Sequence, residues 1–184
     1  MGLDIGVFAH VYASYRDGNC KNSEGEFEPV STGYFNEIAL DTCRRTRNFR
    51  LAQTMHEASG IEILSCPRPR PSTWVVERTE HLTKYQAKLF GLLRQAVKWG
   101  DAESLSNSCA SATASLAGEG FVFVDQPAET MESFVFTKPE FAEGARRLAE
   151  LQLAEDDGTH MNAQYGAAML QKLLARARNG APPL

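Results

Sequence analysis

Six arginines form the most suggestive group of side chains in the sequence. Four lie within seven residues and two follow on a proline-rich stretch: Arg44, Arg45, Arg47, Arg50, Arg68 and Arg70. On a single helix, Arg44, Arg47 and Arg50 would stand three residues apart along one edge. A planar guanidinium grips a carboxylate or a phosphate through two hydrogen bonds. The pattern predicts a binding surface, and the plainer alternative is an exposed face whose arginines pair with acidic side chains of the same chain.

One cysteine is a candidate nucleophile. Cys66 precedes the stiff proline-rich stretch, where Arg68 and Arg70 are close enough in sequence to stabilise a thiolate. Cysteine catalysis also needs a base, and His10 or His81 could approach Cys66 through the fold. The sequence thus keeps open a small enzyme with a Cys/His site.

The sequence contains no complete motif for binding a metal, a cofactor or a nucleotide. His56-Glu57 opens like the zinc-binding HExxH motif, but Gly60 stands where the second histidine is required. No pair of cysteines has the CxxC spacing, and neither common glycine-rich phosphate loop occurs. A second candidate nucleophile, Cys109, falls on an apolar helical stripe, which favours a role in the core. We therefore expect no metal and no cofactor, and a binding role more than a catalytic one.

Apolar periodicity predicts the strands and helices that position these residues. Strands are predicted at residues 3–15, 26–30, 61–64 and 74–77, and a hairpin pairs residues 121–124 with residues 134–136. Helices are predicted at residues 79–99, 101–116, 137–151 and 160–179, and at residues 32–60 in two pieces with Asn48 as the cap between them and Gly60 at the end. The expected fold is α+β, a small mainly antiparallel sheet of about 4–5 strands covered by four or five helices. We expect a single domain, residues 1–184, with the proline-rich stretch as a surface loop.

Charge is divided unevenly along the chain. The 184 residues carry a net charge of only −4, and 43% of them are apolar, as in ordinary globular domains. Residues 44–98 nevertheless hold eleven basic and four acidic side chains, whereas residues 119–157 hold three basic and ten acidic ones. If these blocks remain apart in space, the surface has a basic and an acidic lobe that steer charged partners. If they fold against each other instead, their charges neutralise one another.

The compartment and origin of the chain are also suggested by its sequence. We expect no membrane association and a cytoplasmic protein, because no long apolar run, signal peptide or disulfide framework is evident. The opening Met1-Gly2-Leu3-Asp4 resembles the start of many short phage and prophage proteins. This resemblance implies a mobile-element origin.

These observations favour a non-enzymatic interaction protein that docks on another macromolecule through a charge-polarised surface. In the version that the phage resemblance suggests, it is an accessory or inhibitor protein acting on a host component. A protein partner is the leading expectation. The alternatives are nucleic-acid binding by the row from Arg44 to Arg50 and the Cys/His enzyme.

Overall fold

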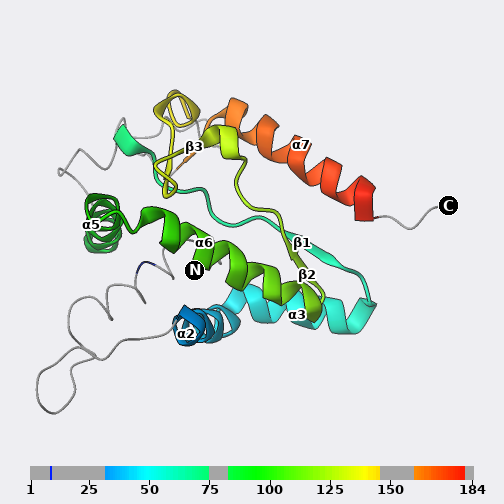
Figure 1. Cartoon of the computed structure of the whole chain (residues 1–184). Coiled ribbons are helices and arrows are strands. Elements are labelled where there is room, and N and C mark those ends of the chain that lie inside the picture. Colours follow the sequence, from blue (N-terminus) through cyan, green and yellow to red (C-terminus); the bar gives the residue numbers. More distant parts are fainter. Residues whose placement is uncertain (1–8, 10–31, 75–82, 146–159, 181–184) are drawn as a thin grey trace, which may run out of the picture.

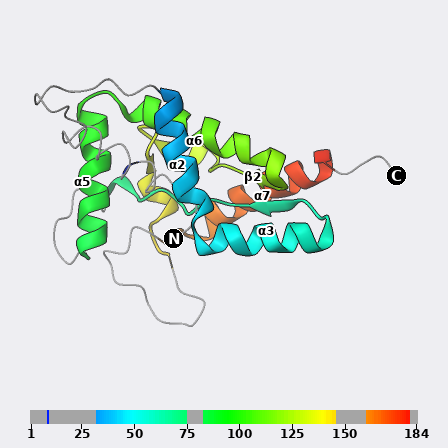
Figure 2. The ribbon, with the colours of Figure 1, turned by 90° about the horizontal axis from the view of Figure 1, so that it is seen from below.

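The computed structural model describes Ala9 and residues 32–74, 83–145 and 160–180 of the chain. Within these residues the fold is α+β, as predicted, with helices that far outweigh the short strands. Helix α6 (Ala102–Ser115) crosses the middle of the molecule and packs against α2 (Thr32–Arg44) and α5 (Lys84–Lys98) (Figure 1). Figure 2 shows α5 at the end of the molecule that is remote from α3 (Arg47–Ser59).

The predicted two-part helix at residues 32–60 is confirmed, with a different cap between its parts. The side chain of Thr46 accepts a hydrogen bond from the backbone N of Phe49 and so begins α3. Asn48 therefore lies inside the first turn, and its assignment as the cap is wrong. Gly60 ends α3 in the left-handed conformation, with φ of 67°, as predicted.

Local capping also sets the ends of α5. Thr83 and Gln86 form a reciprocal capping box, so α5 begins at Lys84; residues 79–82 of the longer predicted helix lie outside the described residues. Gly100, with φ of 76°, follows α5, and Asp101 precedes α6. Both predicted helices are thus found, although the side chain of Asp101 makes no capping hydrogen bond to α6.

The strands pair differently from the prediction. Strand β1 (Ile63–Ser65) pairs in parallel with β2 (Phe121–Phe123), while β3 (Met131–Glu132) pairs antiparallel with β4 (Phe136–Thr137). The predicted hairpin between residues 121–124 and 134–136 is wrong, because Ser133 and Phe134 have φ of 49° and 63° and form the β3–β4 turn. The connection from β1 to β2 runs through α5 and α6, and parallel strands require a long crossover of this kind.

The predicted sheet of about 4–5 strands is not what the described residues form. They contain two separate two-stranded sheets. Three predicted strands lie wholly or mostly outside the described residues. They are the strands at residues 3–15, 26–30 and 74–77.

Two apolar clusters hold the described elements together. The larger one joins α2, α3, α5, α6 and β2, with Phe90, Leu93, Leu116 and Phe121 among its most buried side chains. The smaller one lies under α7 (Ala163–Gly180) and contains Val124, Tyr165 and Met169. The apolar stripe predicted for the last helix is therefore buried at Tyr165 and Met169.

The helix predicted from Thr137 is much shorter in its described part. A 3₁₀ turn, η3 (Pro139–Phe141), stands there, and Gly144 with φ of 67° follows it. Proline begins this turn as predicted, but a glycine in the left-handed conformation interrupts the helical path. Residues 146–151 of the predicted helix lie outside the described residues.

Candidate functional site

The arginine row is split between two helices. Helix α2 ends at Arg44 and α3 begins at Arg47, so the two residues do not share the helix edge that their spacing predicts. The break arises because the Thr46 hydroxyl accepts from the Phe49 N and donates to the Cys43 carbonyl. The expectation of one continuous row is thus wrong.

Two arginines are neutralised by carboxylates of the same chain. Arg44 donates through Nη2 to Glu119 Oε1 at 2.6 Å and through Nε at 3.2 Å. This hydrogen bond raises the pKa of Arg44 and ties the end of α2 to η1 (Leu116–Glu119), just before β2. Arg45 pairs with Asp41, one helical turn earlier, at 2.6 Å between two exposed side chains. Neither charge is therefore available in full to a partner.

Three arginines face solvent. Arg47, Arg50 and Arg68 are exposed, and none of them forms an ion pair with a carboxylate of the described residues. Arg47 and Arg50 stand in the first turn of α3, the helix whose opposite face buries Phe49. This half of the predicted binding set keeps its charge on the surface.

The solvent side of α3 also carries large apolar side chains. Leu51 is 61% exposed and Met55 is 53% exposed, and the two lie one helical turn apart. Ile61, just after the helix, is 64% exposed. We call this surface the α3 face; it consists of Arg47, Arg50, Leu51, Met55, Ala58 and Ile61.

Arg70 lies in the interior, away from solvent. The residue is 3% exposed, and its backbone N donates to Gln126 Oε1 at 3.0 Å. Gln126 in turn donates through Nε2 to the hydroxyls of Thr130 and Thr137, at 3.0 and 2.9 Å. The guanidinium Nη2 forms a long ion pair with Asp125 Oδ2 at 3.8 Å, and Nη1 has no hydrogen-bond partner among the described residues. Arg70 is thus not part of the surface to which its sequence position assigns it.

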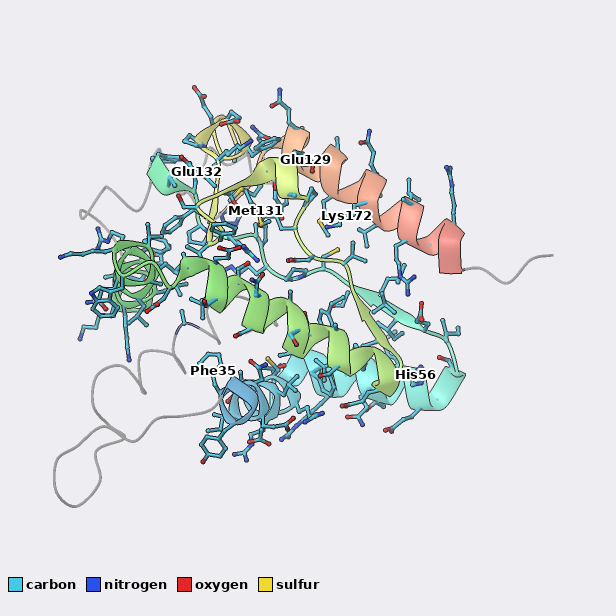
Figure 3. The ribbon with its side chains drawn as sticks, viewed as in Figure 1. Phe35, His56, Glu129, Met131, Glu132 and Lys172 are labelled. Atoms are coloured by element: carbon cyan, nitrogen blue, oxygen red, sulfur yellow. The ribbon has the colours of Figure 1, made fainter. Side chains whose placement is uncertain are left out.

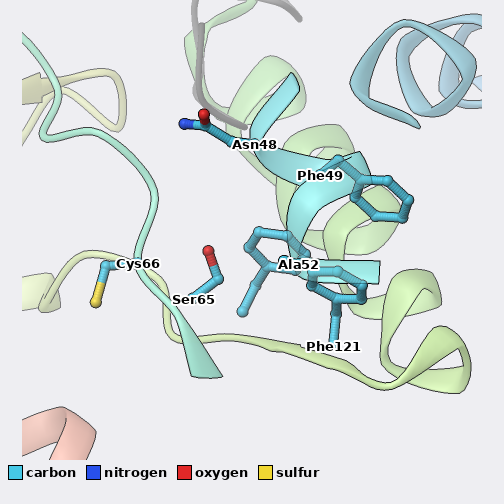
Figure 4. Close-up of a pocket in the computed structure, with 7 residues that line it drawn as sticks. Asn48, Phe49, Ala52, Ser65, Cys66 and Phe121 are labelled. Atoms are coloured by element: carbon cyan, nitrogen blue, oxygen red, sulfur yellow. The ribbon is translucent and has the colours of Figure 1, made fainter. Parts of the chain in front are cut away.

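A small pocket of about 60 Å³ opens where α3 meets the two parallel strands (Figure 4). The rings of Phe49 and Phe121 stack with centroids 4.7 Å apart on one side of it. Its remaining lining is mixed, Asn48, Ala52, Ser65, Cys66 and Phe123. Such a volume holds a few water molecules or a chemical group of similar size.

The Cys66 thiol at this pocket is not activated. Burial around Sγ raises the pKa of Cys66, although the residue as a whole is exposed, so the protonated thiol predominates at neutral pH. The expected stabilisation of its thiolate by Arg68 and Arg70 is not found. Its proposed bases, His10 and His81, lie outside the described residues. The remaining candidate, Cys109, packs partly buried against the larger core from α6.

The sequence reasoning missed the polar cluster around Arg70. Gln126, Thr130, Thr137 and Ser72 are buried there, although none of them belongs to a recognisable motif. Among the described residues no three His, Cys, Asp or Glu side chains gather as a metal site requires. None of the described helices combines the length and apolar composition that a membrane crossing demands.

A comparison with protein-family models, curated proteins and solved structures finds no match for this chain. Function is therefore inferred from the geometry of the described residues.

Proposed function

We propose that this protein is a non-enzymatic docking protein whose α3 face binds an acidic segment of a protein partner. One observation carries the proposal: Arg47 and Arg50 are exposed, without a described carboxylate partner, on the same helix side as exposed Leu51 and Met55. Arginine and methionine are enriched at protein interfaces relative to other surfaces. The apolar side chains supply burial, and the guanidiniums supply bidentate contacts to carboxylates.

The position of two exposed acidic side chains supports docking through the α3 face. Glu129 and Glu132 are exposed near β3, and Figure 3 shows them on the far side of the molecule from His56 of α3. Glu129 and Glu132 disfavour an acidic partner in their own vicinity, whereas Arg47 and Arg50 attract one to the α3 face. Long-range charge of this kind raises association rates and orients the encounter.

Two finer parts of the proposal rest on the sequence. The described cysteines, Cys43, Cys66 and Cys109, form no disulfide, which suits a cytoplasmic protein and a cytoplasmic partner. The resemblance of the first four residues to phage proteins motivates the version in which the partner is a host component that this protein regulates or inhibits.

Charge reversal on the α3 face tests the proposal. A tagged wild-type protein captures its partner from cells, mass spectrometry identifies the partner, and titration calorimetry with the purified partner gives the Kd. We expect the double variant Arg47→Glu, Arg50→Glu to weaken the Kd at least tenfold, about 1.4 kcal/mol.

The matched control places the same charge change elsewhere. Lys84→Glu with Lys88→Glu alters two exposed residues of α5, at the end of the molecule remote from α3, and should leave the Kd within about twofold of wild type. An unchanged Kd for the arginine double variant overturns the proposal.

A further inference from the structure

Polar groups of three segments meet at one side of α7. The segments are the proline-rich stretch at residues 66–71, residues 124–126, and α7. We propose that this junction is a binding site for a small oxyanion, a phosphate or a carboxylate group, with Arg70 as its anchor and Lys172 as the second cation. The site contains no residue of the α3 face and does not depend on the function proposed for that face.

The state of the Arg70 guanidinium is the first argument. Only 4% of its side chain is exposed, and its Nη1 donates to no acceptor. A buried guanidinium is stable only when an anion and further acceptors satisfy it. Charge-assisted N–H···O bonds are about 2.7–2.9 Å long, whereas the nearest described carboxylate oxygen, that of Asp125, is 3.8 Å from Nη2. Among the described residues, Arg70 therefore has only a loose ion pair with Asp125 and no close anionic partner.

Asp125 is held in a position that does not supply this partner. The backbone N of Gln126 donates to Asp125 Oδ1 at 2.8 Å, and the Asp125 side chain is 44% exposed. Its carboxylate is thus oriented by its own chain segment and partly exposed to solvent. Both features oppose a movement of the Asp125 carboxylate toward the Arg70 guanidinium.

Lys172 and Tyr165 supply further donors at the same junction. Lys172 Nζ donates to the Gln126 carbonyl at 3.3 Å, and the Gln126 side chain accepts from the Arg70 backbone N, so Gln126 joins α7 to the proline-rich stretch that carries Arg70. Tyr165 is buried, and burial together with the charges of Cys66 and Asp125 raises its pKa, so its hydroxyl remains a donor at neutral pH. Two cations and one carboxylate leave one positive charge for a bound oxyanion.

Anion-dependent stability tests this site. Ligands that bind the folded state raise the Tm, and phosphate at about ten times its Kd should raise the wild-type Tm by about 3–6 °C relative to chloride at equal ionic strength. Arg70→Met keeps an unbranched apolar stem but removes the guanidinium and its charge, and it should abolish the rise. The control Arg68→Met changes the exposed arginine two residues away and should keep it. Acetate in a parallel series separates a general carboxylate response from a phosphate response.

A second variant keeps the test decisive if Arg70→Met fails to fold. Lys172 is exposed, so Lys172→Met should fold, and it should bind phosphate about two- to fivefold more weakly than wild type. The double variant Arg47→Glu, Arg50→Glu should respond to phosphate as wild type does. The proposal is overturned if neither anion raises the wild-type Tm above the chloride value, or if Arg70→Met or Lys172→Met responds as wild type does.

Discussion

Burial governs the protonation of two side chains near the proline-rich stretch. The pKa of the Cys66 thiol is raised by burial alone, and the pKa of Tyr165 is raised by burial first and by the neighbouring Cys66 and Asp125 next. In both residues burial disfavours the anion. Each therefore remains neutral over a wider pH range than the same residue in water.

Alkylation measures this effect at Cys66. We expect iodoacetamide to modify Cys66 of the native protein more slowly than a free cysteine at pH 7.5, because the thiolate is the reactive species. The rate should continue to rise with pH after that of free cysteine has levelled. Peptide mapping assigns the modified residue. A rate at Cys66 above that of the free thiol would restore the cysteine-enzyme alternative.

Unfolding in denaturant measures the effect at Tyr165. An acid with a raised pKa in the folded state stabilises the fold below its ordinary pKa of about 10, and this stability is lost as the pH rises above that value. We expect the wild type to lose about 1 kcal/mol more than Tyr165→Phe between pH 8 and pH 11, because phenylalanine has no proton to release. Equal losses in the two proteins would contradict the assignment.

At the scale of elements, α3 packs closely against the start of β2 because Gly120 has no side chain. His56 Nδ1 lies 2.8 Å from the carbonyl of Ile61, and the imidazole ring covers Gly120, whose φ is 83°. An added Cβ at Gly120 would overlap that ring. Gly120 also accepts a hydrogen bond from the Ile63 N at 3.0 Å, next to the first residue pair of the parallel sheet.

Two alanine substitutions separate backbone strain from this steric overlap. Gly100→Ala, at φ of 76° with open space around it, should cost only the left-handed strain of about 1–2 kcal/mol. Gly120→Ala should lower the free energy of unfolding clearly more than Gly100→Ala does. Adding His56→Ala to Gly120→Ala should restore the difference between the two. The free energy of unfolding measures all three variants. Equal costs at Gly100 and Gly120 would show that the His56 ring moves aside freely.

The helices could be predicted from the sequence more fully than the strands and the site. Gly60 and Gly100 end helices through local backbone chemistry, which a short stretch of sequence contains. The pairing of Ile63 with Phe121 joins distant segments, for which no local pattern exists. Likewise, the sequence suggested Arg70 as part of a binding surface and did not indicate its burial, because Gln126 contacts it from far along the chain.

At the scale of the whole molecule, Arg47 and Arg50 keep their charge on the surface of α3, although exposed Glu57 of the same helix reduces the local positive charge. His56 of α3 lies on the far side of the molecule from Glu129 and Glu132 (Figure 3), and Arg44 and Arg45 form ion pairs with Glu119 and Asp41. The net charge of −4 hides this arrangement. A partner that approaches the α3 face meets cations interleaved with apolar side chains.

Salt dependence separates a protein partner from nucleic acid at this face. If the three exposed arginines, Arg47, Arg50 and Arg68, bound phosphates, counterion release would lower the affinity about 40-fold between 50 and 200 mM salt. A protein interface that buries Leu51 and Met55 should lose less than about tenfold over the same range. Calorimetric titrations of the captured partner at both salt concentrations measure the ratio. Saturable duplex DNA binding with the steeper response would favour the nucleic-acid alternative.

The parallel pairing of β1 with β2 has a consequence during synthesis. Ser65 emerges from the ribosome early, but Phe123, its partner in the register, follows only after the whole of α5 and α6. A bacterial or eukaryotic ribosome adds about 5–20 residues per second, so the nascent chain holds an unpaired strand for several seconds. Codons that slow translation between α5 and β2 would prolong this interval and expose the nascent edge to aggregation.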